Sequence, residues 1–158
     1  MSINSGIKAA NRESVAIELA KILANEYVLY TKTKNAHWFI ERPDFYDKHK
    51  FIEAQFGELY IVIDLVSERI RSLGHYADAM LKAFLSVTQF TQQKRKKNDT
   101  QSYLIGLLAD HETIITSLKK DISVFAHDYN YIGASNFISE LMETHEKITW
   151  FLRLHLNN

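Results

Sequence analysis

The 158-residue sequence contains no cysteine. This absence excludes disulfide frameworks, thiolate zinc sites, iron–sulfur clusters and cysteine nucleophiles, and it leaves oxygen and nitrogen atoms as the only strong metal ligands. A single proline and five glycines are too few chain breakers for a many-stranded sandwich or barrel. We find no strand–helix alternation and no repeat, so the sequence predicts a mostly helical protein.

The chain also lacks an excess of charge of one sign, because 19 lysines and arginines balance 19 aspartates and glutamates. Such a chain presents no overall basic field toward nucleic acid or membrane, so any DNA contact requires a local patch. The N-terminus has no signal-peptide pattern, and no apolar run approaches the roughly 20 residues of a membrane span. We therefore expect a cytoplasmic protein without membrane contact, folded as one domain over residues 1–158, since 46% of its residues are apolar.

Apolar residues repeat at intervals of three and four along most of the chain, which predicts long helices. The first helix is expected from about Ile7 to Ala36, because it must end before Pro43. The second is expected from near Asp44 to about Ser72, where Gly74 supplies a C-terminal stop.

The connection after the second helix is long and carries a short helix around Ala79 to Leu85. Asp99 is suited to cap a third long helix, and a break near Asp128 to Gly133 precedes the fourth. Four long helices with one long middle connection and two short outer ones predict an all-α, ferritin-like four-helix bundle. The bundle is expected to carry its short helix in the crossover between helices two and three.

Four potential metal ligands share one stripe of the second helix. Each residue of a helix is turned by about 100° around the helix axis relative to the one before it. If the angular position of His49 is taken as 0°, Glu53 lies near 40°, Asp64 near 60° and Glu68 near 100°. The apolar stripe from Ile52 to Ile70 is centred near 300°, so the ligand stripe does not face the core.

The length of the stripe prevents one chain from closing a single site. Glu53 and Asp64 are eleven residues apart, which is about 16 Å along a helix. An antiparallel copy of the helix, related by a two-fold axis, would bring His49 and Glu53 of one subunit opposite Asp64 and Glu68 of the other. We therefore expect a site shared between two subunits.

Residues near the expected crossing point suit a close contact between helices. Gly57 lies near that point and has no side chain to hold the helices apart, while Tyr60, Ile61 and Leu65 could supply an apolar interface around it. His37, at the end of the first helix, could then reach the same site.

The resulting ligand set combines carboxylates with two imidazoles, a mixture that suits iron or manganese and also zinc. The alternative is that the charges on this helix flank are merely solvated. The five candidate ligands, which would also be the catalytic residues, are His37, His49, Glu53, Asp64 and Glu68.

The remaining five histidines are weaker candidates. His111 lies in the apolar register of the third helix, which favours a hydrogen-bonded core histidine. His75, His127 and His155 lie near helix ends, where an imidazolium commonly complements the helix dipole. Neither His111 nor His145 completes a His-Glu-x-x-His motif, which excludes a zinc peptidase of that type. The Glu-x-x-His motif of an intrabundle di-iron site is also absent.

With these residues in view, the chain resembles the Dps family of mini-ferritins, and the resemblance covers essentially the whole sequence. The residues that carry it are His37-Trp38, Glu41-Arg42-Pro43-Asp44-Phe45-Tyr46, His49, Glu53, Asp64, Ser67-Glu68-Arg69, His145-Glu146-Lys147 and Trp150-Phe151-Leu152-Arg153.

The resemblance implies a homo-oligomer, a hollow dodecamer built on two-fold dimers. Such a shell oxidises ferrous iron, preferentially with hydrogen peroxide, and stores ferric mineral inside, which limits oxidative damage to DNA. The resemblance assigns His37, His49 and Glu53 to one subunit and Asp64 and Glu68 to its two-fold mate. Zinc or manganese fits the same ligands.

Some positions depart from the family pattern. Family members often have aspartate in place of Glu53, so the longer side chain here changes the reach to the metal. Trp38 matches a family aromatic residue that is a candidate for intercepting radicals, and a packing role is the alternative. Acidic residues that line an iron-entry pore in the family are missing from residues 131–136, which leaves Asp128 and Glu140 as the nearby acids.

DNA binding is the alternative principal function, with iron chemistry secondary and nucleoid association as its consequence. Family members that coat DNA usually do so through a flexible tail rich in lysine and arginine, which this chain lacks. The one basic run is Lys94, Arg95, Lys96 and Lys97, and its alternative interpretation is a solvated loop. A purely structural bundle is a third hypothesis.

Overall fold

The computed structural model describes residues 5–41, 45–91 and 99–156. Within these ranges the chain forms five α-helices and one π-helical turn, and it contains no strand. The elements are α1 (Ala9–Phe39), α2 (Phe45–Ser72), α3 (Leu81–Val87), α4 (Thr100–Ser123), η1 (Val124–Asp128) and α5 (Ile132–Leu156).

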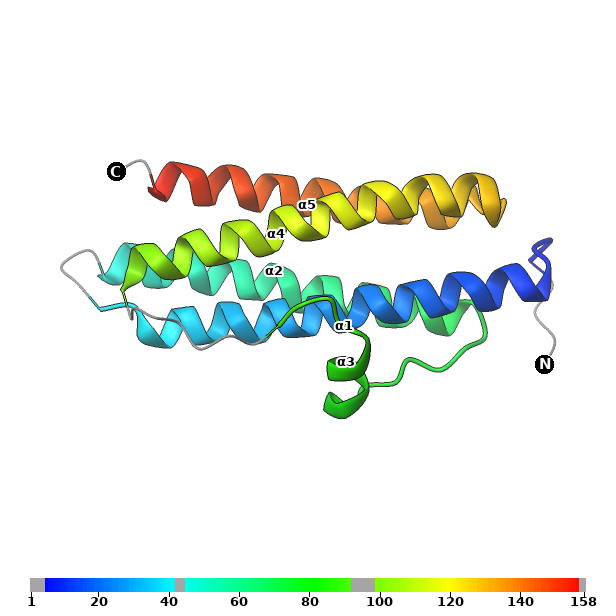
Figure 1. Cartoon of the computed structure of the whole chain (residues 1–158), viewed down its shortest axis with the longest axis horizontal. Helices are drawn as coiled ribbons and strands as arrows, with labels where there is room; N and C mark the ends of the chain where they lie inside the picture. The colour runs from blue at the N-terminus through cyan, green and yellow to red at the C-terminus, as the bar shows by residue number, and fades with distance from the viewer. Residues whose placement is uncertain (1–4, 42–44, 92–98, 157–158) are drawn as a thin grey trace.

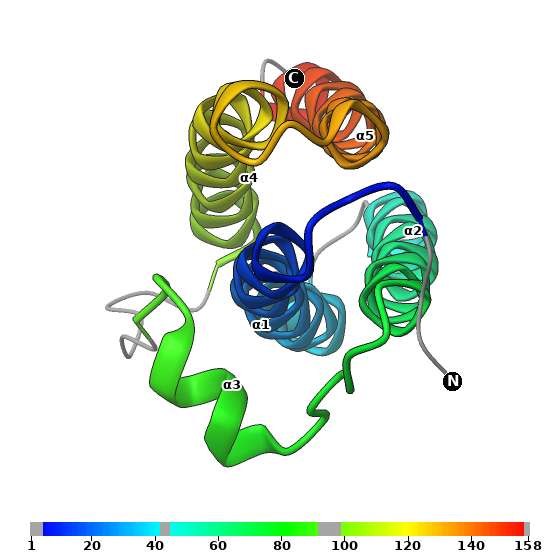
Figure 2. The same cartoon turned by 90° about the vertical axis from the view of Figure 1, so that its right-hand side faces the viewer.

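The four long helices form a bundle in which α1 runs antiparallel to α2, and α4 antiparallel to α5 (Figure 1). The crossover brings the chain back along the bundle, so α2 and α4 run in the same direction. Seen from the end, α3 lies outside the bundle against α1 (Figure 2). The predicted all-α ferritin-like bundle, with a short helix in its long crossover, is confirmed.

The helix boundaries differ from the predicted ones by a few residues. Helix α1 continues to Phe39 instead of ending at Ala36, because nothing before Pro43 breaks it. The crossover helix begins at Leu81 and not at Ala79, since residues 75–80 have no helical structure. As a result, α1 itself carries His37 within its last turn.

Local sequence signals set the helix ends. Gly74 adopts φ +88°, which a residue with a side chain rarely adopts, and so stops the chain after α2. The side chain of Asp99 accepts hydrogen bonds from the amide (2.9 Å) and the hydroxyl (2.8 Å) of Ser102, and thereby caps α4. Before α5 the chain turns at Asn130, which adopts φ +49°.

Each long helix buries one apolar stripe and exposes a polar face. Leu19, Leu59, Leu107 and Leu152 are completely buried, and they come from α1, α2, α4 and α5 respectively. This distribution places one continuous core between the four helices. Among the described residues, no helix combines the length and apolarity needed to cross a membrane.

Candidate metal centre

His37, in the last turn of α1, is oriented by a hydrogen bond across to α2. The residue is 9% exposed, and its Nδ1 lies 3.2 Å from the carbonyl oxygen of His49, to which it donates. A proton on Nδ1 leaves the lone pair on Nε2, the arrangement common among metal-binding histidines. Burial lowers the pKa of His37, and the neighbouring His49 lowers it further. The imidazole is therefore neutral at pH 7, the state in which it can bind a metal.

His49 stacks on His37, with ring centroids 3.5 Å apart and planes 28° apart. The ring centroid of Phe45 lies 4.7 Å from that of His49. The Phe56 ring meets the His37 ring edge-on, with the two centroids 5.2 Å apart. Nδ1 of His49 is buried and has no hydrogen-bond partner within the described residues. A buried polar atom without a protein partner is uncommon, so this nitrogen is suited to bind an ion or a water.

Glu53 lies one turn beyond His49 on α2 and is about half exposed. Its Oε2 accepts a hydrogen bond of 2.6 Å from Lys50. This bond, and the charge of Lys50, lower the pKa of Glu53 below its usual value. The carboxylate is therefore ionised at neutral pH and available to a cation that displaces the lysine.

Asp64 and Glu68 lie further along α2, and both are exposed. Neither makes a hydrogen bond or ion pair with the described residues. The eleven residues between Glu53 and Asp64 span about 16 Å of continuous helix. In the described part of one chain, no group of three or more histidines and carboxylates is arranged to hold a metal ion. We call His49, Glu53, Asp64 and Glu68 the ligand face of α2.

An apolar patch lies between the two halves of the ligand face. Tyr60, Ile61 and Leu65 are 64%, 58% and 45% exposed. A Cβ atom added to Gly57 would meet no atom within 4 Å. Large apolar side chains exposed in a cluster are typical of a surface that another protein covers.

Other predicted functional residues lie away from these contacts or cannot be placed. Trp38 is 67% exposed, with Lys34 Nζ 5.7 Å from its ring centroid, so it does not pack in the core of the single chain. Near the start of α5, Asp128 and Glu140 are exposed. The basic run Lys94, Arg95, Lys96 and Lys97 lies outside the described residues.

A second polar cluster lies inside the bundle, and sequence reasoning placed only one of its members, His111, in the core. Glu26 of α1, His145 of α5 and His111 of α4 are all 0% exposed, and His145 contacts each of the other two. We call these three residues the core relay. His111 is a hydrogen-bonded core histidine, as expected. Glu26 interrupts the apolar register of α1 between Leu19 and Leu29, and a charged residue at such a position was the available signal.

Comparisons with known proteins agree with this architecture. The family model described as Ferritin-like domain matches residues 18–158. The structure superimposes on DpsC from Streptomyces coelicolor with a TM-score of 0.92 at 26% identity, covering 99% of this chain and 91% of that one. Against Dps from Thermosynechococcus elongatus the TM-score is 0.85 at 30% identity, covering 93% and 92%. DNA protection during starvation protein 2 of Bacillus anthracis is 27% identical over 93% of this chain and 99% of its own length.

Proposed function

Because this chain belongs to the Dps family of ferritin-like proteins, we propose that it is a ferroxidase that stores iron. In this proposal, ferrous iron is the substrate and binds between two subunits. His37, His49 and Glu53 of one subunit and Asp64 and Glu68 of its two-fold mate are the ligands. The chain acts as a single domain in the cytoplasm, and the ferric product collects inside a hollow dodecamer.

The observation that carries the proposal is the division of the ligands into two incomplete halves. His37 and His49 are oriented and stacked, yet His49 Nδ1 has no partner among the described residues. Asp64 and Glu68 are exposed on the same helix, and the described part of the chain offers them no partner either. An antiparallel α2 from a second copy would join each half to the other.

The apolar patch supports the same assembly. Tyr60, Ile61 and Leu65 lie between the two halves and would be buried when two α2 helices cross. Gly57 leaves room for the crossing, because it presents only backbone to the partner. Further contacts between such dimers would close the shell.

The proposed chemistry is a two-electron reduction of hydrogen peroxide by two ferrous ions. Each ferrous ion gives up one electron, the O–O bond breaks, and two added protons complete two molecules of water. The three carboxylates of the site stabilise the more highly charged ferric state, and the neutral imidazoles hold iron without adding positive charge.

The direct test replaces one ligand from each half. We expect the double variant His37→Ala/Asp64→Ala to oxidise anaerobically loaded ferrous iron about 100-fold more slowly after peroxide is added. Glu143→Gln, which removes an exposed carboxylate from α5, is the control and should keep the wild-type rate. An unchanged rate in the double variant would reject the assigned site.

The relative from Bacillus anthracis is named for DNA protection, which favours a second candidate function, the binding and compaction of DNA. In this chain the basic run Lys94–Lys97 would supply the phosphate contacts, repeated over the shell. A gel-shift titration across salt tests it, because phosphate binding weakens steeply as salt rises. If the variant with all four residues of Lys94–Lys97 replaced by Gln still retards DNA in the gel as strongly as the native protein, these residues do not bind DNA.

A further inference from the structure

The core relay is one unbroken string of contacts that crosses three helices. Glu26 Oε1 of α1 lies 3.0 Å from His145 Nε2 of α5, and His145 Nδ1 lies 2.8 Å from His111 Nδ1 of α4. None of the three residues belongs to the ligand set of the shared centre. Glu26 is eleven residues from His37, about 16 Å along α1, so the two clusters occupy different levels of the bundle.

The geometry of the relay fixes how many protons its contacts hold. A ring nitrogen either donates one proton or accepts one. Two ring nitrogens 2.8 Å apart therefore share one proton, because with none their lone pairs would face each other and with two their N–H groups would collide. This holds whichever imidazole carries the proton. The contact between His145 and Glu26 likewise holds one proton.

A relay without net charge holds three protons, one in each contact and the third at one of its two ends. These ends are Glu26 Oε2 and His111 Nε2, which are buried and have no hydrogen-bond partner among the described residues. A fourth proton gives the relay a positive charge in the apolar core. It either fills the second unpartnered end or breaks the contact between His111 and His145, and both outcomes are unfavourable.

The charged groups around the relay do not neutralise a fourth proton. Asp110 and Glu112, on either side of His111 in α4, already pair with Lys32 of α1 and Arg153 of α5 respectively. Within the described ranges, the hydrogen bonds and ion pairs of the relay join only its own three members, and α2 and α3 contribute no charged group to them.

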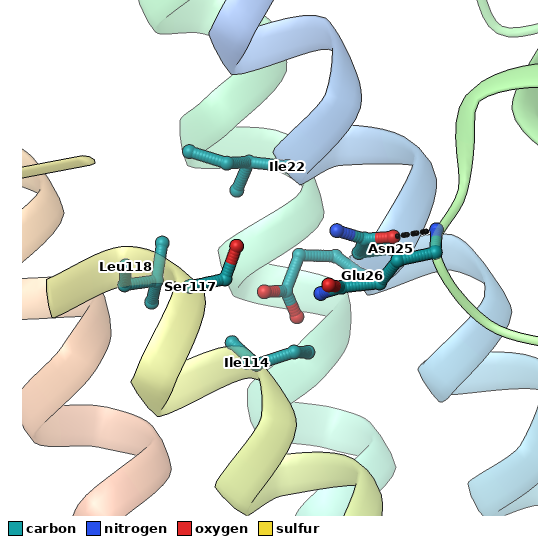
Figure 3. Close-up of a pocket in the computed structure, with 7 residues that line it drawn as sticks. Ile22, Asn25, Glu26, Ile114, Ser117 and Leu118 are labelled. Atoms are coloured by element: carbon teal, nitrogen blue, oxygen red, sulfur yellow. Dashed lines mark hydrogen bonds between the residues drawn. The ribbon is translucent and has the colours of Figure 1, made fainter. Parts of the chain in front are cut away.

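Glu26 also lines a small pocket between α1, α4 and the segment that follows α3. Figure 3 shows its carboxylate directed toward Ser117 and Ile114 of α4. Asn25, beside it, is turned the other way, because its Oδ1 accepts a hydrogen bond of 2.9 Å from the Gln89 amide. None of the residues that line the pocket carries a positive charge, so Glu26 depends on His145 for its partner.

The environment of His111 agrees with this proton count. Burial lowers the pKa of His111 well below its ordinary value, and the charge of His145 lowers it further. In the unfolded chain this histidine has an ordinary pKa of about 6.5, so the unfolded chain binds a proton that the folded chain refuses. Stability is therefore complete above about pH 6.5 and is lost as the pH falls below that value.

We propose that the core relay is an acid-sensitive latch, which holds α4 against α5 at neutral pH and releases α4 when the pH falls. After release, His145 stays paired with Glu26, and His111 carries the added charge and must reach water. The half of the bundle formed by α1 and α2, which bears His37 and the ligand face, keeps its contacts. The latch does not depend on the proposed ferroxidase function, because no residue is common to both.

The first measurement compares urea unfolding across pH in the native protein and in His111→Asn. Asparagine keeps a polar atom near the position of Nδ1 and does not titrate. Between pH 6 and pH 5, we expect the folding equilibrium constant of the native protein to fall about tenfold more than that of the variant, which corresponds to one proton per chain. Both chains carry the same carboxylates, so the difference isolates the histidine. His127→Asn, which removes an exposed histidine from η1, is the control and should keep the native pH dependence.

Hydrogen exchange measured by mass spectrometry locates the opening in the native protein and requires no variant. After correction for the intrinsic effect of pH, peptides around His111 should lose protection at least tenfold between pH 7 and pH 5, while peptides around Leu59 of α2 keep theirs. Equal pH dependence of unfolding in the native protein and His111→Asn would overturn the proposal. Unchanged protection around His111, or an equal loss in α2, would overturn it too. None of these results alters the outcome of the His37→Ala/Asp64→Ala oxidation test, so the two hypotheses are judged separately.

Discussion

The core relay and the ligand face of α2 are both clusters of histidine and carboxylate, but they are organised in opposite ways. The core relay gathers Glu26, His111 and His145 from three helices into a string of direct contacts with no solvent exposure. The ligand face spreads over one helix, and its two distal acids, Asp64 and Glu68, are exposed.

The difference teaches which polar residues the fold of one chain requires and which it does not. A buried carboxylate and its imidazole partner must be held together, since separating them leaves a charge in an apolar core. The acids of the ligand face cost the single chain nothing, because water solvates them. Their shared orientation on one stripe therefore needs a cause outside the chain, and a second copy of α2 supplies it.

The largest expected effect on stability comes from breaking the core relay. His145→Leu removes the partner of Glu26, so we expect the free energy of unfolding to fall by about 3–5 kcal/mol. Asp64→Asn, on the ligand face, should change it by no more than about 0.5 kcal/mol. Urea unfolding at one protein concentration, with chelator present, measures both. Equal losses in the two variants would remove the distinction between the clusters.

A somewhat smaller effect is expected on assembly when the apolar patch of α2 receives a charge. Ile61→Asp places a carboxylate where two helices should cross, which should weaken the dimer by about 100-fold or more. Thr116→Asp, at an exposed position of α4, is the control for adding the same charge. Light scattering after size exclusion should show smaller species for Ile61→Asp alone. A full-sized assembly would contradict the proposed crossing.

The smallest expected effect is on the free energy of unfolding and comes from Asp121. This residue has a partly buried carboxyl group on α4 and belongs to neither cluster. Burial and the nearby Glu18 raise its pKa to about 6. The folded chain therefore holds this proton more tightly than the unfolded chain. The carboxylate costs stability above pH 6, and that cost disappears as the pH falls through 6 toward 4.

Asp121→Asn removes this cost, so we expect about 1 kcal/mol of added stability at pH 7.5, after allowing for solvent screening of a partly exposed group. Near pH 4 the variant and the native protein should unfold alike. Urea titrations at the two pH values make the comparison, with the exposed Asp128→Asn as control. A gain that is the same at both pH values would contradict the assigned cause.

The sequence predicted the fold well because the fold depends on periodicity. Apolar residues at intervals of three and four defined the four long helices, and Gly74 and Asp99 marked two of their ends. The extra turn of α1 to Phe39 escaped prediction, since residues 37–39 carry no apolar register and no breaker. The start of α3 escaped for a similar reason, because a short helix has too few residues to display a period.

The candidate site was predictable only in part. The angular positions of His49, Glu53, Asp64 and Glu68 follow from the helix repeat alone, and the structure places the last two on an exposed face. The stacking of His37 on His49 depends on how α1 packs against α2, which no local pattern encodes. Sharing between subunits stays a prediction, because it concerns contacts beyond the single chain.

The most direct test of that sharing is complementation between two inactive variants. His37→Ala chains and Asp64→Ala chains are each expected to lose peroxide-driven iron oxidation when assembled alone. Unfolded together and reassembled as an equal mixture, half of the two-fold dimers would be mixed, and each mixed dimer would hold one intact site. Shared sites therefore predict recovery of about a quarter of the native rate. A mixture that reassembles into full-sized shells but stays as inactive as its parents would contradict the sharing of ligands between subunits.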